Sequence, residues 1–399
     1  MNQIPEITKV ARIRRKFNEP DRPKFSYQEF VFWDIETNTI EKNGKKKLQF
    51  DLAVMKHVKI YGNGQVEWLE YIRCNTENEL YQNVSRLIDE NKRIIFVAHN
   101  TAFDIRYSHL MDHMTREKWY VSLYYETMST FMLNLKRDKQ RVLFIDSMNW
   151  YNMSLEKLGK YVGLEKQTEN MYSQDRKIRF EYCSNDVDIM IEAFARYKEW
   201  LWNSFGLNMK LTRGGDALNC FRTTLGKQEI RRPSNKLILG KELASYYGGR
   251  TEAFKIGSLS GYTWYKYDIN SLYPFVMANA DYPVSLSKSD YNPYWKEALY
   301  DLRGKIGLGY IECDIEQPAI PSRTKEGHVY PIGKISGYYC GQDLEWLLLH
   351  GSNINLDELH IYDKAPIFKM VIEKLNAFKE MSIEIKCFFQ ECILYSAKF

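Results

Sequence analysis

The stretch YQEFVFWDIE, residues 27–36, combines an apolar run with two acids at its end. Such a run is typical of a buried strand. Asp34 and Glu36 stand two residues apart, and alternate residues of a strand share a face. Two adjacent carboxylates repel unless a cation lies between them, and two Mg²⁺ ions about 3.5–4 Å apart are the common arrangement for phosphodiester cleavage. The pair alone is weak support, because the chain has 51 acidic residues.

The flanking sequence predicts more strands and helices. The turn Gly62-Asn63-Gly64 joins two strand-like runs as a hairpin, and Ser154 is a plausible N-cap. The predicted strands are 53–61, 65–72, 94–98 and 142–146, and the predicted helices are 77–90, 104–114, 154–162 and 179–202. Three strands followed by alternating helices and strands indicate an α/β layer fold with a mixed sheet.

A second acidic element is HNTAFD, residues 99–104. It follows a predicted buried strand and opens a helix, so Asp104 is expected to point back toward the edge of the sheet. Asn100 would supply hydrogen bonds, and Phe103 a stacking platform for a terminal nucleotide. Ordinary capping of the helix explains this element about equally well.

The third element is YCSND, residues 182–186, in the long predicted helix. Tyr182 and Asp186 are four residues apart and share a helix face, which suits the positioning of an attacking water beside metal-bound acids. The plain alternative is an exposed helix turn. A strand end, a strand-to-helix turn and a helix face can converge on one site, and chance explains three such elements far less easily than one.

Together these elements resemble the three motifs of DEDDy-type 3′→5′ proofreading exonucleases, which have an RNase H-like fold. The resemblance implies two Mg²⁺ or Mn²⁺ ions in the site and a water oriented by Tyr182. The metal ligands that it implies are Asp34, Glu36, Asp104 and Asp186. The residues at positions that handle the single-stranded 3′ end are Thr37, His99, Asn100, Phe103 and Ser147. Lys157 falls where protein-primed members place a catalytic-support lysine, and a surface lysine is the alternative.

A second constellation is YKYDINSLYPFVM, residues 265–277. It predicts a strand that ends at Asp268 and a turn held by Pro274. The string resembles motif A of family B DNA polymerases, in which the acid holds both catalytic Mg²⁺ ions and the tyrosine excludes a 2′-hydroxyl. Asp268 would thus be a catalytic metal ligand. The residues that would bind the incoming nucleotide are Ile269, Ser271, Leu272 and Tyr273.

Upstream, Tyr246-x-Gly248-Gly249 resembles the YxGG motif that lies between the exonuclease and polymerase domains of that family and helps to partition the primer end. Two adjacent glycines let the backbone approach a phosphate closely. All three residues are therefore predicted to contact DNA. A simple Gly-Gly turn is the alternative.

The remaining palm motifs of the family are not present intact. The tail KCFFQECILYSAKF, residues 386–399, weakly matches the Lys-x-x-x-Asn-Ser-x-Tyr-Gly motif, with Tyr395 at its tyrosine, and no Tyr-x-Asp-Thr-Asp follows. Glu312, Asp314 and Glu316 alternate with apolar residues and predict a solvated strand face. We therefore expect an incomplete α+β palm, from a split, interrupted, frameshifted or truncated gene.

The resemblance as a whole is to the N-terminal part of protein-primed family B DNA polymerases of small phages and linear plasmids. It implies an exonuclease domain at 1–205, a connecting segment at 206–240 and a partial palm at 241–399 built of short strands and turns. The partial palm includes a strand at 309–316 and a final helix at 367–381. That subgroup carries an insertion here that contacts a priming terminal protein, although an apolar stripe on a helix is more often part of a core than a partner surface.

The expected activity is removal of nucleotides from single-stranded DNA 3′ ends without polymerisation by this chain alone. Primer–template DNA is a second expected ligand. One alternative is a split polymerase completed by a separate C-terminal chain, and another is a non-catalytic protein that binds DNA or terminal protein.

Composition agrees with an ordinary globular protein. Of the 399 residues, 44% are hydrophobic and 27% charged, and the net charge is +5. The aromatic content of 15% fits a single-strand binder and equally a tyrosine-rich core. The 7 cysteines form no Cys-x-x-Cys pair, which argues against zinc and disulfides. Without a signal peptide or a spanning segment, we expect a soluble intracellular protein with no membrane partner, in the host cytoplasm if a phage encodes it.

Overall fold

The computed structural model describes residues 9–10, 27–42, 44–90, 94–170, 173–225, 228–253, 255–258, 260–261, 263–269, 272–325 and 327–377. The described residues fall into two compact units, which divide between Cys220 and Phe221. The first unit holds 27–220, and the second holds 9–10 and 221–377. Ser271 and the tail at 386–399 lie outside the described residues.

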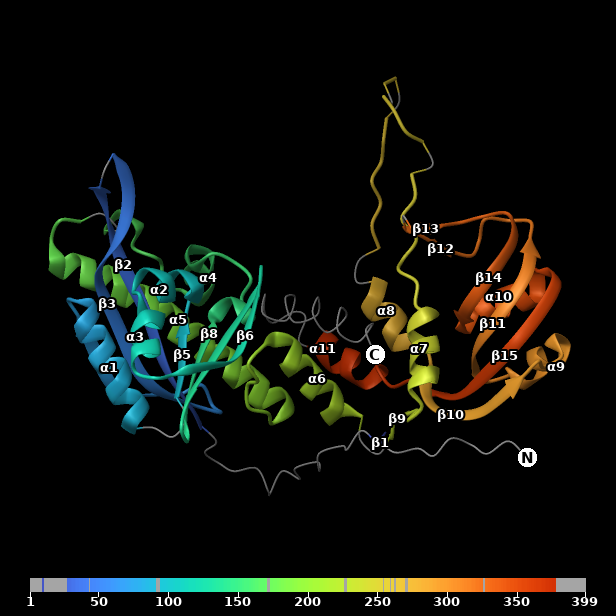
Figure 1. Ribbon diagram of the computed structural model, residues 1–399, viewed down its shortest axis with the longest axis horizontal. Helices are drawn as coiled ribbons and strands as arrows, with labels where there is room; N and C mark the ends of the chain where they lie inside the picture. The colour runs from blue at the N-terminus through green and yellow to red at the C-terminus, as the bar shows by residue number, and fades with distance from the viewer. Residues whose placement is uncertain are drawn as a thin grey trace. The chain divides into compact units, whose positions relative to one another are not determined.

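A seven-stranded mixed sheet in the order β4-β3-β2-β5-β8-β7-β6 forms the centre of the first unit. β5 runs parallel to β2 and to β8, and the other neighbouring strands are antiparallel. The hairpin of β2 and β3 is long and is drawn in blue in Figure 1. The strands are β2 (Tyr27–Lys42), β3 (Lys45–Tyr61), β4 (Val66–Cys74), β5 (Ile94–Ala98), β6 (Tyr120–Thr127), β7 (Thr130–Arg137) and β8 (Gln140–Asp146).

Helices cover both faces of this sheet, because strand residues alternate between the faces and both are apolar. On one face, Trp33 and Phe144 belong to a core that includes the buried side of α1. On the other face, Phe32 packs edge-on against Phe194 of α5 with ring centroids 5.0 Å apart. The helices of this unit are α1 (Glu77–Glu90), α2 (Thr101–Tyr107), α3 (Leu110–Arg116), α4 (Leu155–Val162) and α5 (Arg176–Phe205), with 3₁₀ turns at Ser147–Asn149 and Thr168–Asn170. A further helix, α6 (Arg213–Thr224), begins in this unit and ends beyond the division at Phe221. The predicted α/β class is confirmed.

One prediction for this unit was wrong, and two strands were missed. The single helix predicted at 104–114 is two helices, α2 and α3, because His109 adopts a left-handed conformation with φ 51° and interrupts the helix. The Ser108 hydroxyl also donates to the Asp104 carbonyl and so competes with the helical ladder. Strands β6 and β7 were not predicted at all. The β6 sequence YVSLYYET carries no apolar alternation, and all of its residues are exposed. In β7 the buried residues do alternate, at Phe131, Leu133 and Leu135.

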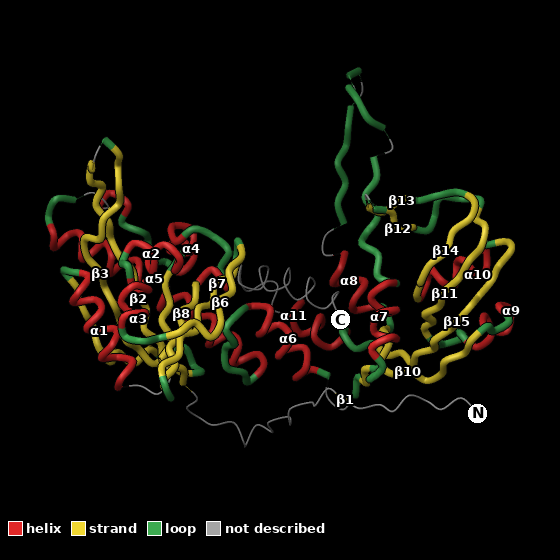
Figure 2. Tube along the Cα trace, viewed as in Figure 1, coloured by secondary structure: helices red, strands yellow, loops and turns green. Residues whose placement is uncertain are grey.

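The second unit contains a four-stranded antiparallel sheet in the order β10-β15-β11-β14, drawn in yellow in Figure 2. Its core includes Leu344 and Leu347 of α10. The strands are β10 (Tyr282–Tyr291), β11 (Ile306–Ile315), β14 (Gly333–Cys340) and β15 (Ser352–Ala365), and two small pairs join β1 (Lys9–Val10) to β9 (Arg231–Arg232) and β12 (Ser322–Thr324) to β13 (Gly327–Val329). The helices are α7 (Lys236–Ala244), α8 (Leu272–Asn279), α9 (Trp295–Asp301), α10 (Gly341–His350) and α11 (Lys369–Ala377).

The second unit differs more from what the sequence predicts. The strand predicted to end at Asp268 is absent, because residues 263–269 pair with none of the strands that the structure describes. Pro274 lies in the first turn of α8 rather than in a turn of its own, a position where its missing N–H costs little. The sheet strands are long rather than short, up to 14 residues in β15.

Other expectations for this half hold. The acids of β11 alternate with buried Ile311, Cys313 and Ile315, as predicted for a solvated strand face. The predicted final helix is α11, which begins at Lys369 and whose predicted end lies outside the described residues. Its stripe is buried, so the core alternative is confirmed. The buried residues of that stripe are Phe368, Val371, Ile372 and Leu375. Among the helices described, none is long and apolar enough to cross a membrane.

Candidate active site

Asp34 and Glu36 occupy the α5-facing side of β2, as their spacing predicts. A register shift follows directly after Glu36 and leaves Asp51 of β3 without a partner in the ladder. Such bulges re-aim side chains and are common beside active sites. The displaced Asp51 forms an ion pair with Arg179 of α5, in which a guanidinium nitrogen lies 2.7 Å from a carboxylate oxygen. Another nitrogen of Arg179 lies 3.8 Å from the Glu36 carboxylate. Arg179 thus ties the strand end to the helix.

Asp104 reaches the same strand end from α2. The amide of Ile35, between the two strand acids, donates to Asp104 Oδ1 across 3.2 Å. The start of α2 is fixed by Asp146 at the end of β8, whose carboxylate accepts from the amides of Thr101 at 2.8 Å and Asn100 at 3.2 Å. Asn100 itself has φ 71°. The capping role predicted as an alternative for this element therefore belongs to Asp146, which leaves the buried Asp104 carboxylate directed at β2.

Tyr182 and Asp186 lie one turn apart on α5, and both are buried. Lys166, from the loop after α4, forms an ion pair with Asp186 and lies 4.7 Å from the centre of the Tyr182 ring. Asp186 Oδ1 is buried and has no hydrogen-bond partner among the described residues. A buried carboxylate oxygen without a partner is costly, so this atom suits a ligand that the protein alone does not supply.

The four acids interact electrostatically, although they come from three separate elements. Burial, and then the charges of Asp104, Asp186 and Glu36, raise the pKa of Asp34 well above its ordinary value. Burial and the Asp186 charge raise the pKa of Glu36 to about 7, against the opposing effect of Arg179. The pKa values of Asp104 and Asp186 are also raised, mainly by burial. Carboxylates gathered in this way need cations to be ionised together.

The donor set fits Mg²⁺ or Mn²⁺, because carboxylate oxygens are the hard ligands that these ions prefer. Cys183, which the sequence reasoning missed, also lies in the cluster: its Sγ and carboxylate oxygens of Asp34 and Glu36 lie within 4.8 Å of one another. Burial raises the pKa of its thiol well above the ordinary value, so it stays protonated. The Cys183 thiol donates a hydrogen bond to Asp34 Oδ2, with the Sγ atom 3.4 Å from that oxygen. No pattern in the sequence marks it.

Most residues predicted to handle the 3′ end lie around this cluster. His99 Nδ1 is 2.7 Å from the hydroxyl of buried Ser147, and burial lowers the pKa of His99, so its ring stays neutral near pH 7. Phe103 packs against Tyr107 with ring centroids 4.5 Å apart. The Thr37 carbonyl accepts a 3.4 Å bond from Arg179. Asn100, also predicted here, is exposed at the start of α2.

Lys157 is exposed on α4, where its amide donates to the N-cap Ser154. Lys166 is the lysine that contacts Asp186 and Tyr182 and acts electrostatically on Asp34. It lies in a loop without periodicity, so only its place between two site elements in the sequence could have suggested it.

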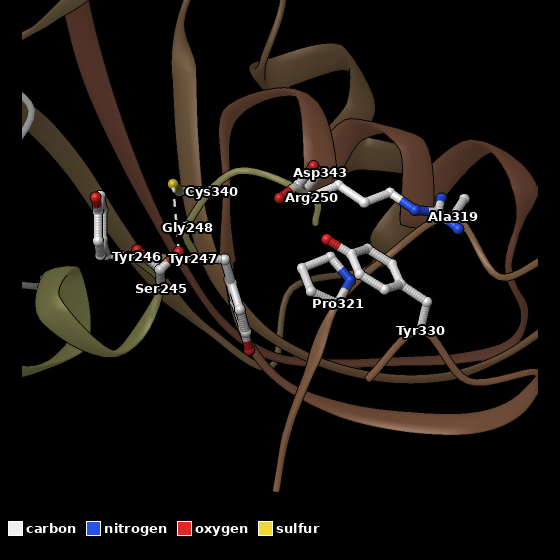
Figure 3. Close-up of a pocket in the computed structure, with 10 residues that line it drawn as sticks. All are labelled: Ser245, Tyr246, Tyr247, Gly248, Arg250, Ala319, Pro321, Tyr330, Cys340 and Asp343. Carbon is white, nitrogen blue, oxygen red and sulfur yellow. Dashed lines mark hydrogen bonds between the residues drawn. The ribbon is translucent and has the colours of Figure 1, made fainter. Parts of the chain in front are cut away.

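The second unit holds a separate cleft of about 340 Å³ where the Tyr246-x-Gly248-Gly249 segment passes the sheet (Figure 3). Arg250 lies against the Tyr330 ring, with the guanidinium 4.2 Å from the ring centre. The residues that line this cleft are Ser245, Tyr246, Tyr247, Gly248, Arg250, Ala319, Pro321, Tyr330, Cys340 and Asp343. A Cβ on Gly249 would come 3.8 Å from the Tyr273 hydroxyl. The YxGG-like and motif A-like segments are therefore neighbours.

The motif A-like residues are open to solvent. Asp268, Ile269, Leu272 and Tyr273 are exposed, and Ser271 lies outside the described residues. In the part of the chain that the structure describes, Asp34, Glu36 and Cys183 are the one set of three or more His, Cys, Asp or Glu side chains whose ligand atoms all lie within 4.8 Å of one another. No such group includes Asp268.

Comparisons with known proteins show the family to which the chain belongs. A family model described as DNA polymerase type B, organellar and viral, matches residues 125–386, more than half of the chain. A probable DNA polymerase of Ascobolus immersus is 24% identical over 245 residues, 58% of this chain and 20% of that protein. The DNA polymerase of Bacillus phage B103 is 26% identical over 229 residues, 50% of this chain and 36% of that protein. The chain thus spans about a fifth to about a third of the length of these two relatives.

Among solved structures, Phi29 DNA polymerase in an orthorhombic crystal form matches with a TM-score of 0.60 and 16% identity, over 92% of this chain and 67% of that one. Phi29 DNA polymerase complexed with single-stranded DNA matches with a TM-score of 0.58 and 16% identity, over 92% and 66% of the two chains. At this identity the likeness is one of fold.

Proposed function

Since the chain belongs to the type B DNA polymerases of organelles and viruses, we propose that its acid cluster removes nucleotides from the 3′ ends of single-stranded DNA. The observation that carries this proposal is the convergence of Asp34, Asp104 and Asp186 from β2, α2 and α5, in which Asp34 interacts electrostatically with both of the other acids. A binding-only protein has no need for buried acids that raise one another's pKa.

Asp34, Glu36, Asp104 and Asp186 would hold two Mg²⁺ or Mn²⁺ ions. The bound ions would supply an activated water and stabilisation of the leaving oxygen. The unpaired Asp186 Oδ1 is a natural ligand atom for one of them.

The remaining chemistry falls to this chain's own side chains. The Tyr182 hydroxyl, kept protonated because burial and the Asp186 charge raise its pKa, would hold the attacking water by a hydrogen bond. The Lys166 ammonium would offset negative charge that develops on the scissile phosphate. Water oxygen bonds to phosphorus as the bond to the 3′ oxygen breaks, and a proton passes to that oxygen. The products are a nucleoside monophosphate and a strand one nucleotide shorter.

Groups around the cluster would hold the terminal nucleotide. Phe103 offers a ring on which a base can stack, and Asn100 and neutral His99 offer hydrogen bonds. Thr37 and Ser147 complete this set. These positions are proposals that rest on the family resemblance and on their closeness to the acids in the fold.

The test is degradation of a 5′-labelled single-stranded oligonucleotide by the full chain in Mg²⁺ or Mn²⁺. Asp34→Ala and Asp186→Ala should each lose at least about a hundredfold in rate, in line with removal of an essential electrostatic group. Glu181→Ala is the matched control, because Glu181 is exposed on the same helix. Trimming by Asp34→Ala and Asp186→Ala at the parent rate would contradict the proposal.

A polymerase role is proposed for the second unit only in combination with further protein. Asp268, Ile269, Ser271, Leu272 and Tyr273 would serve as motif A. A triphosphate with two metal ions needs more than one carboxylate, and no second acid is grouped with Asp268 among the described residues. On a primer–template with deoxynucleotides, the chain alone should shorten the primer and not extend it, and extension would contradict this. A priming terminal protein and a completing polymerase chain stay predictions from the resemblance.

A further inference from the structure

Cationic and aromatic side chains alternate along the β4 edge of the first unit's sheet and reach the start of α5. Each neighbouring pair is within cation–aromatic distance. We call these side chains the cation–aromatic ladder: Arg176, Phe180, Arg73, Tyr71, Lys56 and Trp68. No step of the proposed trimming reaction uses any of them.

The outer part of the ladder is built on β3 and β4. Lys56 Nζ lies 5.3 Å from the Tyr71 ring centre and 5.7 Å from the Trp68 ring centre. The Lys56 ammonium forms an ion pair with Asp188 of α5, with Nζ 2.6 Å from a carboxylate oxygen. Both rings are therefore fixed over a buried charge, while Trp68 is 56% and Tyr71 44% exposed. Their outer faces are open to a ligand.

The inner part joins β4 to α5. The Arg73 guanidinium lies 5.2 Å from the Tyr71 ring centre and 5.4 Å from that of Phe180, and its Nε donates to the Tyr71 hydroxyl at 2.8 Å. Arg176 lies 5.6 Å from the same Phe180 ring. Arg176 forms an ion pair with Asp51 at 3.1 Å. Exposed Arg73 forms none with a carboxylate in the described part of the chain. Its charge is therefore available to an anion.

A strand irregularity creates this arrangement. Regular alternation would place Trp68 and Tyr71 on opposite faces of β4. The β3–β4 ladder skips Leu69, at a register shift between His57 and Val58. The extra residue moves Trp68 to the face that carries Tyr71. The single bulge at Leu69 thus places Trp68 on the same face of β4 as Tyr71 and Arg73.

The ladder lies on the same face of the sheet as the acid cluster. Arg73 pairs with Val54, and Val54 pairs with Asp34, so the three residues form one row across β4, β3 and β2. With neighbouring strands about 4.8 Å apart, the backbone of Arg73 lies roughly 10 Å from that of Asp34. The ladder is near the cluster and distinct from it.

We propose that the cation–aromatic ladder is a second binding surface for single-stranded DNA, which holds an internal segment of a strand rather than its 3′ end. Unpaired bases stack on the open faces of Trp68 and Tyr71, and a phosphate pairs with Arg73. Fixed rings interleaved with cations are the elements from which surfaces for single strands are built. Because the charge of Arg73 is not neutralised by a carboxylate, this surface favours a polyanion such as DNA over a neutral protein surface.

The test is the dissociation constant of the full chain for a circular single-stranded oligothymidylate, measured by fluorescence anisotropy in EDTA. A circle has no 3′ end to enter the acid cluster, and without a divalent ion no trimming is expected. Failure of this proposal is therefore distinguishable from failure of the proposed exonuclease. Trp68→Ala and Tyr71→Ala should each weaken binding about tenfold, as loss of one base stack does.

The matched control is Tyr120→Ala, because Tyr120 is 57% exposed on β6, the opposite edge strand. It should bind the circle as the parent does. Arg73→Gln should lower the slope of log affinity against log salt by about 0.7, the value for one phosphate contact on a single strand. Duplex DNA of equal length should bind all variants alike. Unchanged affinity in Trp68→Ala and Tyr71→Ala would overturn the proposal, and this is also the result expected if the surface binds a protein instead of DNA. An equal loss of affinity in Tyr120→Ala would overturn it as well.

Discussion

The amide of Ile35 donates to the carboxylate of Asp104 across 3.2 Å. This bond joins the strand residue that separates Asp34 from Glu36 to the acid that α2 supplies. It sets the position of Asp104 relative to Asp34 and Glu36. Because the donor is a backbone amide, a substitution of the Ile35 side chain does not remove it.

Replacement of Asp104 by asparagine should abolish trimming and keep the fold. The amide oxygen can still accept from Ile35, but the charge that would bind a metal ion is lost. The rate on single-stranded DNA should fall at least about a hundredfold, with the far-ultraviolet circular dichroism of the parent. The control is Asp112→Asn, at an exposed position of α3. Near-parental trimming by Asp104→Asn would remove Asp104 from the ligand set.

Lys166 and Lys157 should respond oppositely to mutation. Lys166→Ala removes the cation beside Asp186 and Tyr182, so kcat should fall about 10²–10³-fold with a small change in KM. Lys157→Ala, at an exposed position of α4, should trim within about twofold of the parent. Single-turnover kinetics on one labelled oligonucleotide measures both. The reverse order of effects would restore the assignment that the resemblance implies for Lys157.

Asp146 should contribute more to stability than to chemistry. Its carboxylate accepts from the amides of Asn100, Thr101 and Met148. Asp146→Ala leaves these donors without their acceptor and should lower the free energy of unfolding by about 2–4 kcal/mol. Urea denaturation measures the change, with Asp112→Ala as the exposed control. A loss no larger than that of the control would show that water replaces these bonds at little cost.

Buried Lys198 should make stability depend on alkaline pH. Burial lowers its pKa to about 8 in the folded chain, against about 10.4 in an unfolded chain. Between these values the unfolded state holds one more proton, so the free energy of unfolding rises with pH, by up to about 3 kcal/mol. Lys198→Met should lack this rise between pH 8 and pH 10, and Lys157→Met should keep it. Parallel urea curves for the parent and Lys198→Met across that range would show that the ammonium stays charged inside the fold.

Local periodicity was sufficient for much of the fold and for the acids. Period-two alternation placed Asp34 and Glu36 on one face, and four-residue spacing placed Tyr182 and Asp186 on one side of α5. Such patterns involve neighbours in the chain, so one sequence suffices to predict them. The exposed strand β6 carries no such pattern, and neither does the break at His109, where one backbone angle divides a predicted helix into two.

The opening stretch YQEFVFWDIE by itself determined a buried strand with two acids on one face. Only the tertiary structure decided what surrounds those acids. Lys166, Cys183 and Arg179 reach the cluster from a loop and a helix more than a hundred residues along the chain, through contacts that leave no periodic trace. The same holds for Arg73, which joins the row of Asp34 because β3 aligns the two strands, and for Trp68, which faces outward because one residue of β4 is left unpaired.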